Sequence, residues 1–451
     1  MKIIIVGLGN VGQTLAVNLL EEGNSVTVVD LSSEKIKKIT DKYDILGVVG
    51  NGATHTTLRE AGISSADLLI AVTESDELNL LCCTIAKKTS KCHTVARVES
   101  PEYSTEVEYL KEGLDLAMVI NPEEEGAKEI CRLIRFPEAI NIETFAKGKV
   151  ELMKFRIPKD SSMIGLSVKE VMMKYKLNLL ICTVERGEEA HIPNASFVFE
   201  ENDIISIIAS PRTAEAFFKK IGGRDIAIRD MMIVGVSELT QYVLKELHKS
   251  GINIKVIEGD LSVCEEICAQ FDDATIIHGD GTEQELLVEE GIKQTDALLA
   301  LSDTDEENIL ISLFAHRVTG AKVITKINRP EYSTMTANLN LDTIIYPKNI
   351  ASDRITRYVR SLGATEGNNV ENLYSIIKGK IEVTEFVVGK LFPDLGVPLS
   401  ELPLKEDVII GAILRGRSLI IPHGQDCLMA GDHVVVVSKH LGIGEFRELF
   451  H

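Results

Sequence analysis

The sequence predicts an α/β protein with two tandem doubly wound parallel sheets, each followed by a small α+β domain. Three observations support this prediction: a glycine-rich turn directly after an apolar strand, an alternation of short apolar segments with helical ones, and a repeat of the whole pattern in the second half. The 451 residues, 45% hydrophobic and 26% charged, have the composition of ordinary globular domains.

Strands and helices alternate at the start of the chain. A helix is expected after the first glycines, and a second near Ser32-Ser33, where Ile36, Ile39 and Tyr43 share one face. Short apolar runs typical of buried parallel strands occupy residues 3–6, 26–29, 45–49, 68–72, 94–98 and 117–120. Six strands in this alternation predict a doubly wound parallel sheet.

A different pattern follows the first sheet. It predicts a small, mostly antiparallel α+β domain with strands at 150–157, 179–184, 196–198 and 204–209 and helices at 168–175 and 214–220.

Both patterns recur further along the chain. Leu58–Ile63 returns as Leu287–Ile292, and Asp67–Thr73 as Asp296–Ser302. The duplication predicts four domains and a hinge between the halves near residues 221–223. We expect these domains over residues 1–136, 137–222, 223–364 and 365–451.

Charge and cysteine content exclude several classes of function. The formal net charge of −20 disfavours binding to nucleic acid and to anionic lipid, and suits a basic protein partner. The eight cysteines lack the spacing of a zinc site or of a disulfide framework, so we expect no metal and mostly buried, reduced thiols. No apolar run is long enough for a membrane span, which indicates a soluble, intracellular chain.

The glycine turn Gly7-Leu8-Gly9-Asn10-Val11-Gly12 is the most informative motif. It follows a strand and opens a helix, which is typical of a Rossmann-type dinucleotide site. Gly7 permits the tight turn, Gly9 lets a pyrophosphate approach the backbone, and Gly12 allows close packing of helix on strand. Asp30, at the end of the second strand, can bind ribose hydroxyls and would repel a 2′-phosphate, so NAD(H) is favoured over NADP.

Other polar residues follow the third, fourth and fifth strands. Asn51-Gly52, Thr73-Glu74 and Arg97 stand where the carboxyl ends of parallel strands meet a ligand. Arg97 is a candidate phosphate contact, with a surface salt bridge as its alternative.

The second glycine turn, which begins at Gly235, departs from the first. Ser237 replaces the glycine that a pyrophosphate approaches, and Thr240 stands at the helix–strand contact, where it would crowd the packing. Glu238 adds negative charge at the phosphate end, while Glu258 retains the ribose-binding acid. We expect weakened or lost nucleotide affinity here; a mononucleotide such as ATP or AMP is the lesser alternative.

Catalytic groups are not evident. His55 and His93 qualify only by residue type, and the acidic runs at 123–125 and 303–307 are expected to be solvated helix starts rather than cation sites. The absence of an acid–base set indicates a sensor more than an enzyme. An NAD-dependent oxidoreductase stays open as the alternative, as does a ligand sensor acting on a different channel or an antiporter.

The order and spacing of these motifs resemble the TrkA family, the NAD-binding regulatory subunits of Trk potassium uptake systems. The segments that carry the resemblance, which covers essentially the whole chain, are Lys2–Gly12, Val28-Val29-Asp30, Gly50-Asn51-Gly52, Leu58–Gly62, Ala71-Val72-Thr73 with Asp76-Glu77-x-Asn79, and Ala96-Arg97-Val98 before Ser100-Pro101.

The resemblance implies two tandem RCK halves and a function without chemistry of its own. Residues 7–11 would hold the pyrophosphate and Asp30 the ribose, and Asn51, Gly52, Thr73, Glu74 and Arg97 would complete the pocket, with ATP or ADP as competitors at the same site. The protein would form a homo-oligomeric cytoplasmic ring docked under an integral membrane potassium channel subunit of the Trk type, peripheral to the inner face of the cell membrane. Ser237 and Thr240 depart from the family pattern in the second half.

Overall fold

A computed structural model describes the chain in two compact units. The Rossmann unit comprises Met1–Cys131 and Ile228–Thr356, and the C-terminal unit comprises Arg132–Ala227 and Arg357–His451. The structure describes all of residues 1–451 except 101–102, 104–105, 138, 147–148, 158, 160, 188, 222–227, 330–331, 337–338, 340, 342, 365–369, 378–379 and 444. The expected hinge at 221–223 therefore lies largely outside the described residues, and the four domain boundaries stay a prediction.

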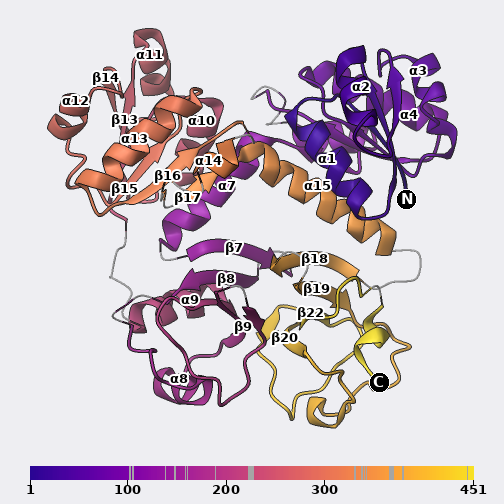
Figure 1. Cartoon of the computed structure of the whole chain (residues 1–451), viewed down its shortest axis with the longest axis vertical. Coiled ribbons are helices and arrows are strands. Elements are labelled where there is room, and N and C mark those ends of the chain that lie inside the picture. Colours follow the sequence, from indigo (N-terminus) through magenta and orange to yellow (C-terminus); the bar gives the residue numbers. More distant parts are fainter. Residues whose placement is uncertain are drawn as a thin grey trace. The chain divides into compact units, whose positions relative to one another are not determined.

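The first half contributes a six-stranded parallel sheet to the Rossmann unit, as predicted (Figure 1). Its strands run in the order β3-β2-β1-β4-β5-β6, so the direction of winding reverses between β1 and β4. The strands are β1 (Lys2–Val6), β2 (Ser25–Asp30), β3 (Leu46–Val49), β4 (Leu68–Ala71), β5 (His93–Arg97) and β6 (Met118–Ile120). A ligand crevice is expected at this reversal, beyond the carboxyl ends of the strands.

Helices of the first half begin where the sequence supplies caps. The Ser32 hydroxyl accepts the Lys35 N–H and starts the second helix, whose buried face carries Ile36 and Ile39, as predicted; Tyr43 does not belong to this face, because the helix ends at Thr40. The helices are α1 (Asn10–Glu21), α2 (Ser33–Thr40), α3 (His55–Glu60), the short 3-10 turn η1 (Ile63–Ser65), α4 (Asp76–Thr89), α6 (Val107–Gly113) and α7 (Pro122–Arg135).

The second half repeats this arrangement. Its parallel sheet has the order β14-β13-β12-β15-β16-β17. The strands are β12 (Asp230–Val234), β13 (Asn253–Glu258), β14 (Ala274–His278), β15 (Ala297–Ala300), β16 (Lys322–Lys326) and β17 (Thr343–Ile345). The helices are α10 (Glu238–Leu247), α11 (Leu261–Gln270), α12 (Gln284–Glu289), α13 (Asp305–Val318), α14 (Ser333–Thr336) and α15 (Pro347–Ala364).

Each half also contributes a five-stranded antiparallel sheet to the C-terminal unit (Figure 1). The first, in the order β10-β9-β11-β8-β7, contains β7 (Ala139–Phe145), β8 (Val150–Arg156), β9 (Leu180–Arg186), β10 (Glu189–His191) and β11 (Ile204–Ala209), with helices α8 (Val168–Tyr175) and α9 (Pro211–Lys220). The second, in the order β18-β19-β22-β20-β21, contains β18 (Val370–Ile377), β19 (Ile381–Val387), β20 (Val408–Arg415), β21 (Ser418–Ile420) and β22 (His433–Ser438), with 3-10 turns η3 (Leu399–Glu401) and η4 (Phe446–Leu449).

Two details of the first module differ from expectation. The predicted strand at 196–198 is wrong, because only Val198 forms an isolated bridge, with Ser167. β7 was not expected, and its fully buried residues, Ala139, Ile142 and Phe145, fall at every third position rather than at every second one as in a regular half-buried strand.

The two C-terminal modules share a hydrophobic core. Phe145, Leu152 and Ile208 of the first module pack in one cluster with Val383 and Val435 of the second. A Cβ added at Gly411 would lie 2.5 Å from Ile208 Cδ1, so glycine allows this close approach. The two modules therefore pack together as parts of one compact unit.

The cysteines fit the predicted reduced and mostly buried state. Five of the eight thiols are buried, and all eight are free. Burial raises the pKa of Cys82 and of Cys182 to about 12, which keeps both thiols protonated and unreactive near neutral pH. Within the described residues, no helix is both long and apolar enough to cross a membrane.

Candidate functional site

The first glycine turn connects β1 to α1 at the reversal of the sheet. Gly7 has a φ of +99°, and a Cβ there would lie 2.9 Å from the Thr73 nitrogen. A Cβ on Gly12 would lie only 1.9 Å from the Gly7 oxygen. Both glycines are thus required by contacts within the protein.

Gly9 differs from these two glycines. A Cβ at this position would meet no atom within 4 Å, so the space beside it is open. Its N–H has no hydrogen-bond partner among the described residues, and it stands as the N-cap of α1. Free N–H groups and the helix dipole make this end of the crevice suitable for a phosphate. Asn10 and Val11 form the first turn of the same helix.

Asp30 ties the glycine turn to the end of β2. Its Oδ2 accepts the Leu8 N–H at 2.7 Å, and its Oδ1 accepts the Ser32 N–H at 2.8 Å. Each carboxylate oxygen has a further lone pair for a ribose hydroxyl. Asp30, which is predicted to bind the ribose, therefore also stabilises the conformation of the glycine turn.

A buried asparagine that the sequence analysis did not single out for the pocket organises the other side of the crevice. Asn79 Oδ1 accepts both the N–H (2.8 Å) and the hydroxyl (2.7 Å) of Thr73. Its Nδ2 donates to the carbonyl oxygens of Thr73 (3.1 Å) and Arg97 (3.0 Å). Asn79 thus joins the ends of β4 and β5; its return as Asn308 in the second half is the sequence signal.

The third strand supplies a tight turn. A Cβ on Gly52 would lie 2.2 Å from Val6 Cγ1, so glycine lets this loop approach β1. The side chain of Asn51 accepts the Ala53 N–H at 2.9 Å and closes the turn. The predicted residues of strands one to four therefore line one edge of the sheet.

Arg97 makes an ion pair in this structure. Its Nε donates to Glu99 Oε1 at 2.6 Å, and a second nitrogen binds Glu99 Oε2, with the arginine side chain 14% exposed. The salt-bridge alternative is thus observed, and a phosphate would have to compete with or join Glu99. Glu74, which follows β4, is exposed.

The second glycine turn keeps the hydrogen bond to the end of the second strand but differs at the surface that would meet a ligand. Val236 N–H donates to Glu258 Oε2 at 2.7 Å, matching the bond between Leu8 and Asp30. The Thr240 hydroxyl donates to the Gly235 oxygen at 2.9 Å and accepts the Ser237 N–H at 3.3 Å. The expectation that Thr240 crowds the packing is corrected, because the turn accommodates it with a hydrogen bond. The N–H of Ser237, which is equivalent to that of Gly9, therefore already has a hydrogen-bond partner.

The acidic runs are only partly solvated, which corrects the expectation for them. Glu123 and Glu125 are 9% and 8% exposed, and Glu125 pairs with Arg354 and Lys128. Asp305 is 2% exposed because its oxygens accept the N–H groups of Asn328 and Arg329. Glu125 and Asp305 therefore serve contacts inside the Rossmann unit.

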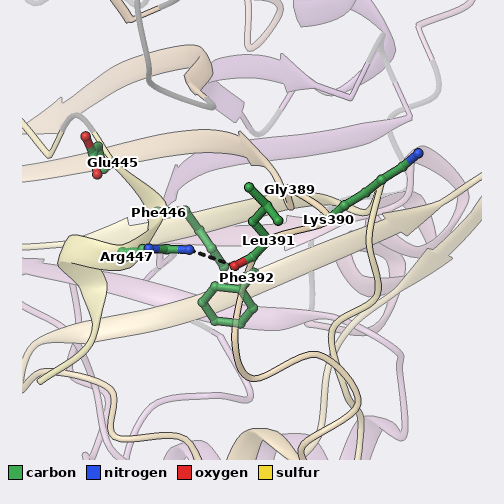
Figure 2. Close-up of a pocket in the computed structure, with 7 residues that line it drawn as sticks. All are labelled: Gly389, Lys390, Leu391, Phe392, Glu445, Phe446 and Arg447. Carbon is green, nitrogen blue, oxygen red and sulfur yellow. Dashed lines mark hydrogen bonds between the residues drawn. The ribbon is translucent and has the colours of Figure 1, made fainter.

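Two other features could receive a ligand. A hollow on the second C-terminal module is lined by Gly389, Lys390, Leu391, Phe392, Glu445, Phe446 and Arg447, with Arg447 donating to the Leu391 oxygen at 2.7 Å (Figure 2). Among the described residues, His248, Asp272 and Asp273 form an exposed group that could reach one metal ion, but Asp273 already binds His248 and the Lys249 N–H.

The fold and the glycine turn define a class: a protein of two RCK-like halves with Rossmann-type nucleotide folds. Family models confirm the class, since the TrkA-N domain model matches residues 3–122 and 231–347, and the TrkA-C domain model matches residues 152–222 and 383–451. The chain belongs to the TrkA family.

Relatives of full length support the same assignment. The chain is 30% identical over 450 residues to a Trk system potassium uptake protein TrkA homolog of Archaeoglobus fulgidus, with 100% of both chains covered. It is 31% identical over 444 residues to the Trk system potassium uptake protein TrkA of Vibrio alginolyticus, covering 97% of this chain and 95% of the relative.

Solved structures share the fold at low identity. A GsuK channel bound to NAD has a TM-score of 0.64 at 14% identity, covering 97% of this chain and 76% of the channel. The GsuK RCK domain has a TM-score of 0.62 at 15% identity, covering 97% of this chain and 92% of that domain.

Proposed function

We propose that this protein is an NAD(H)-binding regulatory subunit, without catalytic activity, that gates a membrane potassium uptake channel of the Trk type. The observation that carries the proposal is the open first crevice: a helix N-terminus with a free Gly9 N–H and open space beside it, next to the Asp30 carboxylate. Membership of the TrkA family supports the transport role, and the GsuK channel bound to NAD supports the nucleotide.

The proposed ligand set is the one predicted from the sequence. Gly7, Leu8, Gly9, Asn10 and Val11 hold the pyrophosphate, and Asp30 binds the adenosine ribose. Asn51, Gly52, Thr73, Glu74 and Arg97 complete the pocket. ATP or ADP would compete at the adenosine end.

Gating requires only that the nucleotide bind two conformations of the assembly with different affinity. The proposed assembly is a homo-oligomeric ring at the inner face of the membrane, held there by the basic cytoplasmic loops of its channel partner. The net charge of −20 supports such a partner.

The Asp30 assignment has a matched control within the chain. Asp30→Ala should weaken NADH binding at least about tenfold, because charge-assisted bonds to two ribose hydroxyls are lost. Loss of the bond to Leu8 would also loosen the turn, so Glu258→Ala, which removes the equivalent bond to Val236, controls for that effect. Calorimetry with NAD⁺, NADH and ATP measures both variants; unchanged NADH affinity in Asp30→Ala would exclude the assignment.

The partner and the lack of chemistry are tested separately. A potassium channel subunit should copurify from mildly solubilised membranes, and recovery of no integral membrane protein would count against the regulatory role. Steady NADH consumption with a carbonyl substrate would favour the oxidoreductase alternative instead.

A further inference from the structure

The two nucleotide folds of the Rossmann unit contact each other through equivalent elements. Asn10 Nδ2 donates to the Asn328 oxygen at 3.4 Å. Tyr242, in the helix α10 that follows the second glycine turn, donates from its hydroxyl to the carbonyl oxygen of Glu99 at 3.4 Å, and Glu99 is the counterpart of Asn328. The helix after each glycine turn thus contacts the equivalent carbonyl of the other half, which defines an approximate two-fold axis.

Helices α7 and α15 occupy equivalent places about this axis. α7 begins at Pro122 after β6, and α15 begins at Pro347 after β17. A Cβ on Gly126 of α7 would lie 3.1 Å from Leu239 Cδ1 and 3.3 Å from Pro347 Cβ. The start of α7 therefore lies near the glycine turn of the second half and near the start of α15. By the two-fold relation, the start of α15 has the matching place beside the glycine turn of the first half.

Glu123 is the second residue of α7, and its surroundings show what the start of this helix faces. Its Oε2 is buried without a hydrogen-bond partner among the described residues. Burial raises the pKa of its carboxyl; the charges of Glu99, Glu238 and Asp303 raise it further, while Lys326 lowers it. Three of these neighbours belong to the second half and are the counterparts of Asn10, Glu74 and Arg97. Glu123 therefore faces the mouth of the second crevice.

Lys348, the second residue of α15, is the counterpart of Glu123. The two-fold relation directs it toward Asn10, Glu74 and Arg97 at the mouth of the first crevice. Lys348 is partly buried, and within the described part of the chain it makes no ion pair. A lysine is the ordinary point-charge ligand of a phosphate.

We propose that Lys348 of the second half contacts the pyrophosphate of the dinucleotide held by the first half. The nucleotide site is then completed across the two folds, and this inference rests on the proposed NAD(H) site of the first half. At the equivalent place in the second crevice, Glu123 adds a negative charge that opposes a phosphate. Lys348 thus favours a phosphate in the first crevice, whereas Glu123, at the equivalent position, opposes a phosphate in the second.

The test uses calorimetry of NADH binding to the full-length chain at several salt concentrations. Lys348→Met should weaken binding about tenfold, the scale of one charge-assisted contact, and should flatten the dependence of affinity on salt. Lys348→Arg should retain most of the affinity, because the charge remains. Lys293→Met, at an exposed lysine of the same unit, should match the wild type.

Asp30→Ala separates this inference from the proposed function. If Asp30→Ala weakens binding and Lys348→Met leaves both affinity and salt dependence unchanged, Lys348 is not a ligand and the inference fails alone. If neither variant changes NADH binding, the first-half site itself is wrong and both proposals fail. Thermal unfolding without nucleotide checks that Lys348→Met is folded, and Lys348→Gln provides a second neutral variant.

Discussion

The first and second nucleotide folds share a backbone frame and differ at the surface that would meet a ligand. Both glycine turns are tied to the second strand by a carboxylate, Asp30 or Glu258, and both have a positive φ at the first glycine. In the first turn the Gly9 N–H is free, whereas in the second the Ser237 N–H is bonded to Thr240. The comparison teaches that a fold can be preserved by internal hydrogen bonds after its ligand contacts are replaced.

The largest expected difference concerns the third glycine of the turn. Gly12→Ala should lower the free energy of unfolding by about 3 kcal/mol and weaken NADH binding more than tenfold, because its Cβ would lie 1.9 Å from the Gly7 oxygen. Thr240→Ala removes the hydroxyl and the γ-methyl group of the second turn and should leave NADH binding unchanged. Chemical denaturation and calorimetry measure the two effects; a Gly12→Ala variant that binds NADH normally would contradict the comparison.

Substitutions of the two equivalent asparagines, Asn79 and Asn308, should have an intermediate effect and should distinguish a loss of stability from a loss of NADH binding. Asn79→Ala and Asn308→Ala each remove a buried amide that joins two strand ends, so each should cost about 2 kcal/mol of stability. Only Asn79→Ala should weaken NADH binding, because only the first crevice is proposed to hold the ligand. Equal losses of NADH affinity in both variants would show that the two crevices are not functionally different.

The smallest expected effect concerns pH. Because the pKa of Glu123 is raised in the folded state above its ordinary value of 4.5, ionisation costs stability as pH rises above that value. Glu123→Gln should therefore stabilise the chain on the order of 1 kcal/mol at pH 8, with the gain disappearing toward pH 4. Thermal unfolding across this range measures it, with Glu124→Gln as the neighbouring control. A gain independent of pH would argue against a buried, ionisable Glu123.

Local patterns of the sequence predicted the nucleotide folds well. Both sheets and the start of α2 follow from apolar runs, glycine turns and serine caps, which act within a few residues. The helix at Val168–Tyr175 has the predicted bounds because Ser167 and Glu170 form a capping box. β7 and the short polar β10 were missed, since pairing with neighbouring strands rather than periodicity defines them.

Contacts between distant segments explain what the sequence could not predict about the site. The ion pair of Arg97 with Glu99 follows from their positions at the end of β5, but residue types alone left a phosphate contact equally open. The burial of Glu123 depends on the second half, which lies more than 100 residues further along the chain. No local pattern distinguishes such a carboxylate from a solvated one.

The shared core of the C-terminal modules has a consequence for how the halves could diverge. In a homodimer of half-length chains, each residue near the two-fold axis meets the same residue types on both sides, so a changed charge alters both crevices at once. Here Ile208 and Val435 pack in one covalently linked body, so each half always has the other as its neighbour. Glutamate at 123 and lysine at 348 can therefore coexist, and one gene encodes an obligate asymmetric pair.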